Sequence, residues 1–273
     1  MKITHLGNMP FKNNKNLPKL IYKYRIWGDE SHKTILTKRI VFFAPPSSFE
    51  DKNDCKLHKR YDLMTKSDIY NKYLNFSKKN HEHWNNQQHS LFAKKWTERS
   101  PLTNLEYVSK LQTEHFKDFD SKFGILCLTT NPNNLKMWNK YSQNGKGFCV
   151  GFDPEILFEL TGGGRPVDYP KTLPIIHHDD NYLIERIKQV YSKEKKWSFE
   201  EEYRTHKTFF NVASKKDRQV KVPPEAYKVI IFGWSTPDKS KAEIKKTCNE
   251  NGLNVVFKVC SLKMNEIEII TCG

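Results

Sequence analysis

The strongest constraint on the fold is a set of short runs rich in aromatic and β-branched residues. Each run is five to eight residues long and most are followed by Gly, Pro or Asn, at residues 20–27, 40–44, 124–130, 148–153 and 227–234. This length and composition are typical of strands. Two further runs, 254–260 and 266–270, have the same character. The sequence therefore predicts a sheet built from strands that are distant from one another along the chain.

Helical patterns occupy the long intervals between these runs. Residues 52–122 carry apolar side chains at three- and four-residue intervals amid Lys, Asn, Gln and His, which predicts a helical insertion after the second strand. Further helices are expected over 179–195 and 238–250. We therefore predict an α+β fold, a single domain over 20–273 with a central, mostly antiparallel sheet. An irregular N-terminal arm at 1–19 precedes it.

The charge balance limits the partners that the chain can have. Lys and Arg number 46 against 31 Asp and Glu, a formal net charge of +15. Such a field attracts polyanions such as nucleic acid, although an AT-rich genome, which encodes many Lys and Asn residues, would give the same excess. Both explanations stay open.

Cysteine usage and hydropathy indicate the compartment. The six cysteines, of which Cys272 is the last, form no C-x-x-C pair, so we expect reduced thiols. No stretch approaches the roughly 20 apolar residues that span a bilayer. We expect a cytoplasmic protein with no membrane partner.

The first candidate motif lies between two predicted strands. Met137, Trp138 and Tyr141 fall at helical spacing, so that Trp138 and Tyr141 share one face. An aromatic face of this kind either packs in the core or presents rings to a ligand. Packing is the commoner outcome.

The second candidate motif is W-S-F-E-E-E-Y-R at 197–204. If it is a strand, Glu200, Glu202 and Arg204 share one face, because strand side chains alternate. Two carboxylates and a guanidinium would then converge. The alternative is a solvated edge strand that carries a surface ion-pair ladder.

Taken together, these motifs resemble an uncharacterised bacterial family, the domain of unknown function 2971. The resemblance rests on M-W-x-x-Y, G-x-C-x-G-F and W-x-x-E-x-E-x-R, together with K-Y-R at 23–25, S-F-E-D at 48–51 and V-I-I-F-G at 229–233, and it extends over nearly the whole chain. Family members usually have N-D-P after the phenylalanine, whereas this chain has Glu50-Asp51-Lys52. The family name implies no reaction.

The order of polar residues also resembles the plan of the mono-ADP-ribosyltransferases. These enzymes place an arginine or histidine on the first strand, a serine or tyrosine near the second and a carboxylate on a later strand, often as E-x-E. Arg25, Ser47 or Ser48, and Glu200-x-Glu202 follow that order here. The S-T-S triplet of the arginine-type enzymes is absent.

This second resemblance implies NAD as substrate and assigns a role to each residue. Glu202 would stabilise the positive charge that develops on the ribose as nicotinamide leaves, and Glu200 would accept the proton of the incoming nucleophile. Arg25 would bind the phosphates.

The remaining cofactor-binding residues would be Ser47, Ser48, Tyr24, Trp138 and Tyr141, with Tyr24 or Trp138 stacking on the nicotinamide or adenine. The acceptor would be a nucleic acid or a protein. Such an enzyme would act as a toxin or phage-defence effector, with an antitoxin or another defence protein as a possible partner.

Two alternatives compete with this reading. His177, His178, Asp179 and Asp180 would suit a metal-dependent nuclease if they had spaced ligand partners, but Asp179 is expected instead to cap a helix, and we predict no metal site. The histidines at 81, 83 and 89 are expected to face solvent. A noncatalytic nucleic-acid-binding module would need only the basic surface.

Overall fold

The computed structural model describes residues 17–271, which form two compact units. Unit 1 consists of the residues up to 51, of 120–172 and of those from 193 onward. Unit 2 consists of 52–119 and 173–192. The predicted insertion thus begins where unit 2 begins, but the sequence did not indicate that 173–192 join it. Of the predicted N-terminal arm, residues 1–16 lie outside the described residues, and so does Cys272.

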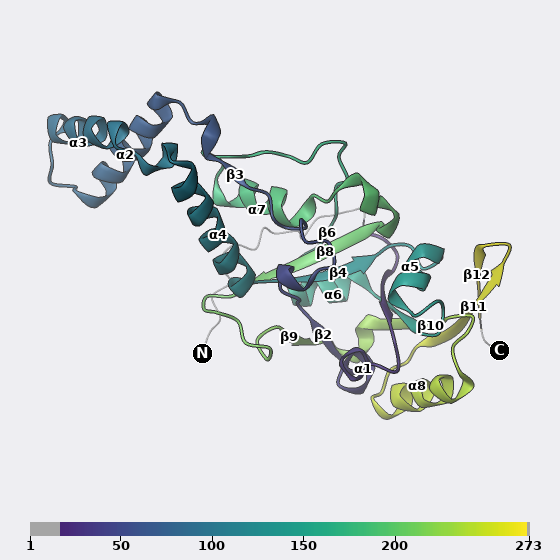
Figure 1. Cartoon of the computed structure of the whole chain (residues 1–273). Coiled ribbons are helices and arrows are strands. Elements are labelled where there is room, and N and C mark those ends of the chain that lie inside the picture. Colours follow the sequence, from purple (N-terminus) through teal and green to yellow (C-terminus); the bar gives the residue numbers. More distant parts are fainter. Residues whose placement is uncertain (1–16, 272–273) are drawn as a thin grey trace. The chain divides into compact units, whose positions relative to one another are not determined.

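Unit 1 is organised around an eight-stranded sheet (Figure 1). Its strands are β1 (Ile21–Arg25), β4 (Phe123–Thr129), β5 (Phe148–Phe152), β6 (Arg165–Pro166), β8 (Glu202–Thr208), β10 (Tyr227–Phe232), β11 (Val256–Lys263) and β12 (Glu266–Thr271). Their order across the sheet is β12-β11-β10-β5-β1-β4-β8-β6. Only β10 and β11 run parallel among these neighbours. The predicted α+β class with a mostly antiparallel sheet is therefore confirmed.

Alternating side chains of the central strands build two cores. On β5, Phe148 and Val150 belong to one buried cluster, whereas Cys149 between them belongs to the other. On β10, Ile230 and Ile231 divide in the same way. This division follows from the two-residue period of a strand, and it explains why these runs lack polar residues.

Short helices connect the strands of unit 1. The α-helices are α1 (Glu30–Thr37), α5 (Leu135–Tyr141), α6 (Pro154–Thr161) and α8 (Asp238–Glu250), and the 3-10 turns are η1 (Pro46–Ser48), η4 (Lys195–Glu200) and η5 (Pro224–Ala226). In α6, the Asp153 carboxylate accepts hydrogen bonds from the first-turn N–H groups, and Gly162 ends the helix at a φ of 88°. Glycine is favoured at this position because the backbone there is left-handed.

The second predicted strand lies elsewhere than expected. β2 (Ile40–Phe42) pairs with β9 (Gln219–Lys221) in a separate two-stranded sheet and is not a strand of the eight-stranded sheet. Of the predicted run 40–44, Ala44 forms an isolated antiparallel bridge to the central sheet, at Ile125 of β4. Pro45 and Pro46 follow this run, and proline cannot donate to a ladder, so the chain turns into η1 instead.

The motif at 197–204 is a strand only in part. Residues Lys195–Glu200 form η4, and β8 begins at Glu202. Between them Glu201 adopts a φ of 42°. Periodicity alone did not separate these elements, because Trp197 and Phe199 of the 3-10 turn lie at the same two-residue spacing as Tyr203 of the strand.

Unit 2 is mainly helical. Its helices are α2 (Lys66–Asn80), α3 (Asn86–Glu98), most of α4 (Leu105–Lys122) and α7 (Tyr182–Tyr191), with the 3-10 turns η2 (Tyr61–Leu63) and η3 (Pro101–Thr103). The short strands β3 (Lys59–Arg60) and β7 (Ile176–His177) pair in parallel. The α2–α3 hairpin has a capping box at each helix start, Thr65 with Asp68 and Asn85 with Gln88. Such reciprocal caps satisfy the free N–H groups of a first turn.

Two expectations for unit 2 are corrected. Asn181, rather than Asp179, caps α7, because its side chain accepts from the Leu183 and Ile184 N–H groups. His89 does not face solvent: it is 4% exposed, and its Nδ1 lies 2.7 Å from the Ser77 hydroxyl.

Candidate functional site

Strand β8 brings a carboxylate and a guanidinium together on one face of the sheet. Arg204 donates from Nε to Glu202 Oε1 at 2.8 Å and from Nη2 to Glu202 Oε2 at 2.9 Å. The two residues are two positions apart on the strand, so their side chains point to the same side. Arg204 is 0% exposed and Glu202 is 4% exposed. The pair is a buried, bidentate ion pair.

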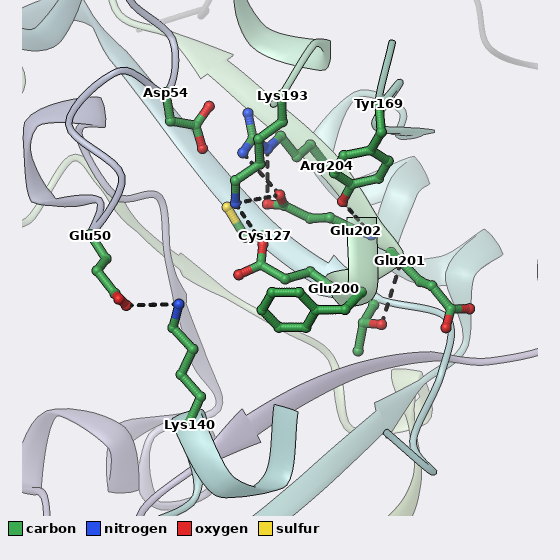
Figure 2. A network of polar contacts seen from close by, with 12 residues as sticks. Glu50, Asp54, Cys127, Lys140, Tyr169, Lys193, Glu200, Glu201, Glu202 and Arg204 are labelled. Atoms are coloured by element: carbon green, nitrogen blue, oxygen red, sulfur yellow. Dashed lines mark hydrogen bonds and ion pairs between the residues drawn. The ribbon is translucent and has the colours of Figure 1, made fainter. Parts of the chain in front are cut away.

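Lys193 joins a second carboxylate to this pair. Its ammonium donates to Glu200 Oε2 at 2.5 Å and to Glu202 Oε2 at 3.3 Å (Figure 2). The left-handed turn at Glu201 separates the 3-10 turn from β8, and Glu200 still reaches the same ammonium. The Tyr141 hydroxyl donates to the other oxygen of Glu200, Oε1, at 2.6 Å. Glu200, Glu202, Lys193 and Arg204 are called the charge cluster below.

The pKa values in the charge cluster follow from burial and opposite charge. Burial alone would raise the pKa of Glu202, but the Arg204 and Lys193 cations outweigh it and lower that pKa to about 2. Glu202 is thus ionised at neutral pH. Burial, followed by the charge of Glu200, raises the pKa of Tyr141, so its hydroxyl stays a hydrogen-bond donor. Glu202 is fixed from the backbone side too, since its N–H donates to the Tyr169 hydroxyl at 3.0 Å.

A third cation approaches from β1. Strands β1 and β4 are registered at one position, Tyr22 with Thr129, and Lys23 donates from Nζ to the Cys127 carbonyl at 2.5 Å. Burial, then the nearby Arg25, lowers the pKa of Lys23 to about 8, against the opposing effects of Cys127, Glu202 and Glu200. Lys23 alternates with Tyr22 and so lies on the strand face opposite Glu202, and its charge interacts with the two carboxylates from across the sheet.

The S-F-E-D loop covers the same region. The Phe49 ring lies 5.6 Å from the Arg204 guanidinium, and Glu50 accepts from Lys140 at 3.0 Å (Figure 2). The Lys140 ammonium also lies 3.9 Å from the centre of the Trp197 ring. The loop whose family N-D-P is missing here thus still contacts the charge cluster through its phenylalanine.

The sequence-predicted residues divide between the charge cluster and other places. Glu200, Glu202 and Tyr141 meet directly, as described above. Ser47 binds Asp120 through its N–H at 2.6 Å and its hydroxyl at 2.9 Å, and Ser48 donates to the Pro45 carbonyl. These contacts hold the loop after β2.

Arg25 lies at the end of β1. It donates to the Tyr24 carbonyl at 3.1 Å, and its pKa is lowered to about 10 by burial, which Asp29 partly opposes. Tyr22 on β1 pairs with Thr129 on β4, and Thr129 pairs with Glu202 on β8, so these three side chains lie on the same face of the sheet. Strand alternation places Arg25 on the opposite face of β1 from Tyr22. Arg25 therefore does not share a face with Glu202.

Tyr24 and Trp138 pack against each other in the core. Their ring centres are 5.0 Å apart, edge to face, and Trp138 is 0% exposed. The Tyr24 hydroxyl donates to the Asn131 carbonyl and the indole N–H of Trp138 to the Pro132 carbonyl. The structure thus shows the packing arrangement for these rings, and their role in stacking on NAD stays a prediction.

Sequence reasoning missed Lys23, Lys193, Cys127 and Tyr169. Lys23 had a signal, because it lies two residues before Arg25 on a predicted strand. Lys193 had none, since it is one of many lysines and only the fold shows that its side chain is 8% exposed.

Within residues 17–271, no group of three His, Cys, Asp or Glu side chains is arranged to hold a metal ion. Asp180, from the candidate metal cluster, accepts from the His177 N–H at 2.9 Å and from Lys188 at 2.6 Å. In the same part of the chain, no helix combines the length and apolarity needed to cross a bilayer.

The fold and the charge cluster define a mixed α+β protein with a buried, paired-carboxylate site. Residues 137–205 match the family described as "Protein of unknown function (DUF2971)". The resemblance noted from the motifs is thereby confirmed over this segment, which includes Tyr141, Lys193, Glu200, Glu202 and Arg204. Comparison with curated proteins and with solved structures gives no match.

Proposed function

We propose that the chain is an NAD-dependent transferase that moves ADP-ribose to an acceptor, with Glu200 and Glu202 as its carboxylates. The observation that carries the proposal is the single ammonium shared by the two side chains. Because its contacts of 2.5 Å and 3.3 Å meet at one nitrogen, the two carboxylates lie within about 6 Å of each other. Carboxylates at such separations serve the cleavage of glycosidic bonds, and the bond between ribose and nicotinamide is of that kind.

Glu202 supplies a fixed negative charge. As the bond between ribose C1′ and the nicotinamide nitrogen breaks, nicotinamide leaves with the bonding electron pair, and positive charge develops on the sugar. A carboxylate held by Arg204 and Lys193 needs no reorganisation to stabilise that charge. Its lowered pKa keeps it ionised across the physiological range.

Glu200 accepts the proton that the acceptor loses. The acceptor's nucleophilic atom forms the new bond to C1′, and its proton passes to Glu200, which releases it to solvent. Tyr141 and Lys193 each donate one hydrogen bond to Glu200, one to each oxygen, and each oxygen retains a further lone pair for this proton.

The cation that binds the phosphates stays unassigned in this proposal. Arg25, which the order of residues suggested, does not share a face with Glu202, and Lys23, two residues before it on β1, lies on the same side as Arg25. Because both glutamate side chains are 4% exposed, NAD must displace covering side chains when it binds.

The acceptor is proposed to be a nucleic acid, in the context of a toxin or phage-defence effector held in check by an antitoxin or another defence protein. The net charge of +15 supports a polyanionic acceptor. A protein acceptor is the alternative.

The test is transfer of label from adenylate-labelled NAD to RNA, DNA or cell lysate by the purified chain. We expect Glu202→Gln and Glu200→Gln each to lower transfer by about 100-fold or more. Glu201→Gln is the matched control, because Glu201 is an exposed neighbour whose side chain accepts a hydrogen bond from Asn131 and does not belong to the charge cluster. Absence of transfer and of NAD binding with the unaltered chain would refute the proposal and leave a nucleic-acid-binding module as the better candidate.

A further inference from the structure

The α2–α3 hairpin of unit 2 carries a series of aromatic side chains in ring contact. The rings of His81 and Trp84 stack at 4.0 Å, those of Phe76 and Phe92 at 6.3 Å, and those of Tyr73 and Trp96 at 5.8 Å. Trp84 contacts Phe92 at 5.8 Å and Phe92 contacts Trp96 at 6.1 Å, which joins the pairs into one series. This set, called the aromatic ladder, consists of Tyr73, Phe76, His81, Trp84, Phe92 and Trp96.

The ladder follows from helical spacing and consists of other residues than the buried positions of the two helices, although Trp84 also contacts the ring of the buried His89 at 6.0 Å. Phe92 and Trp96 are four residues apart on α3, and Tyr73 and Phe76 are three apart on α2, so each pair shares a helix face. The buried positions of the two helices are others, namely Ile69, Ser77, His89 and Ala93. Phe76 is 53% exposed and Trp96 is 40% exposed. Large aromatic surface is therefore open to a ligand along the ladder.

Positive charge accompanies the ladder. Residues 66–99 contain seven Lys and Arg against three Asp and Glu. Lys79 lies three residues after Phe76 and Arg99 three residues after Trp96, so each is a neighbour of an exposed ring, and both are exposed. The hairpin thus combines flat apolar rings with flanking cations.

We propose that the aromatic ladder is a binding surface for single-stranded nucleic acid. Bases stack on aromatic rings whatever their sequence, and Lys and Arg contact the phosphates between them. Charge complementarity selects a polyanion. Asn71, Asn75, Asn80, Gln87 and Gln88 are exposed on the same hairpin, and a lipid surface would instead require a broad apolar face.

This inference involves residues of unit 2 alone and does not rest on the proposed transferase activity. It holds whether or not the charge cluster of unit 1 consumes NAD. Its test therefore uses binding, with no catalytic readout.

The experiment measures fluorescence anisotropy of a labelled oligothymidine of about 20 nucleotides, titrated with the whole chain at several salt concentrations. Phe76→Leu and Trp96→Leu keep apolar volume but remove the flat ring, and each is expected to weaken binding by about 5- to 150-fold. Trp96→Phe keeps a ring and should retain most of the affinity. Lys79→Gln and Arg99→Gln should each remove one phosphate contact and so reduce the slope of log affinity against log salt concentration by about one.

Leu91→Ala is the control for general surface change, because Leu91 is 60% exposed on α3 but does not belong to the ladder. Circular dichroism of each variant confirms that the hairpin remains folded. Equal affinity of Phe76→Leu, Trp96→Leu and the unaltered chain would overturn the proposal. The proposal would also be overturned if Trp96→Leu lowered the affinity for phosphatidylserine vesicles as much as the affinity for the oligonucleotide. Tighter binding of the chain to duplex than to single strands would overturn it as well.

Discussion

Replacement of Lys193 by methionine should destabilise the protein by about 3–5 kcal/mol at neutral pH. Glu200 is 3% exposed, and its described partners are the Lys193 ammonium and the Tyr141 hydroxyl. Methionine has a similar length but no charge. The variant therefore leaves a buried carboxylate with one neutral donor, and loss of one member of a buried ion pair costs several kcal/mol because the other charge stays desolvated.

The dependence of this loss on pH can be derived from Glu202. Its pKa is lowered from 4.5 to about 2, with Lys193 as the second of the two cations responsible. A lowered carboxyl pKa stabilises the native state above the unfolded pKa, and the stabilisation is lost as the pH falls towards the folded pKa. A difference of that size corresponds to about 3 kcal/mol, shared between Arg204 and Lys193. The difference in free energy of unfolding between Lys193→Met and the unaltered protein should thus be largest above pH 4.5 and should decrease between pH 4.5 and 2.

The assay is urea denaturation followed by circular dichroism at pH 7 and at about pH 3. Lys196→Met is the matched control, since Lys196 pairs with Glu194 at the surface and is 62% exposed. Its midpoint should equal that of the unaltered protein. A loss below about 1 kcal/mol for Lys193→Met, or a loss of the same size at both pH values, would refute the reasoning.

Two further changes test the packing of the fold. Gly233→Ala should destabilise unit 1 by roughly 1–3 kcal/mol in thermal denaturation, because the new Cβ would meet the Gly145 carbonyl oxygen at 2.1 Å. The control is Gly28→Ala, whose new Cβ would have no atom within 4 Å and should leave the melting temperature unchanged. Equal melting temperatures of the two variants would contradict this explanation. Ser77→Ala should cost about 1–3 kcal/mol, since it leaves the buried Nδ1 of His89 without its described partner; a melting temperature equal to that of the unaltered chain would show that the contact contributes nothing.

Most secondary-structure elements follow from local sequence. The strands near Tyr22, Ile125, Val150 and Ile230 and the helix 238–250 were predicted because each is a single run with one period and clear boundaries. Where the chain changes period within a few residues, as at Glu201, local reasoning failed. The sequence correctly predicted that Glu200 and Glu202 lie close together, but the reason, strand alternation, was partly wrong because Glu200 belongs to a 3-10 turn.

The sequence by itself determined the fold class, the positions of most strands, and the choice of Tyr141, Glu200 and Glu202 as candidate site residues. These depend on periodicity and on motifs within short windows. The tertiary structure alone decided that Lys193 is buried between the two carboxylates and that β2 leaves the central sheet. A lysine becomes a cluster cation only when strands from distant segments remove it from water beside opposite charges, and no local pattern records which of many lysines that is.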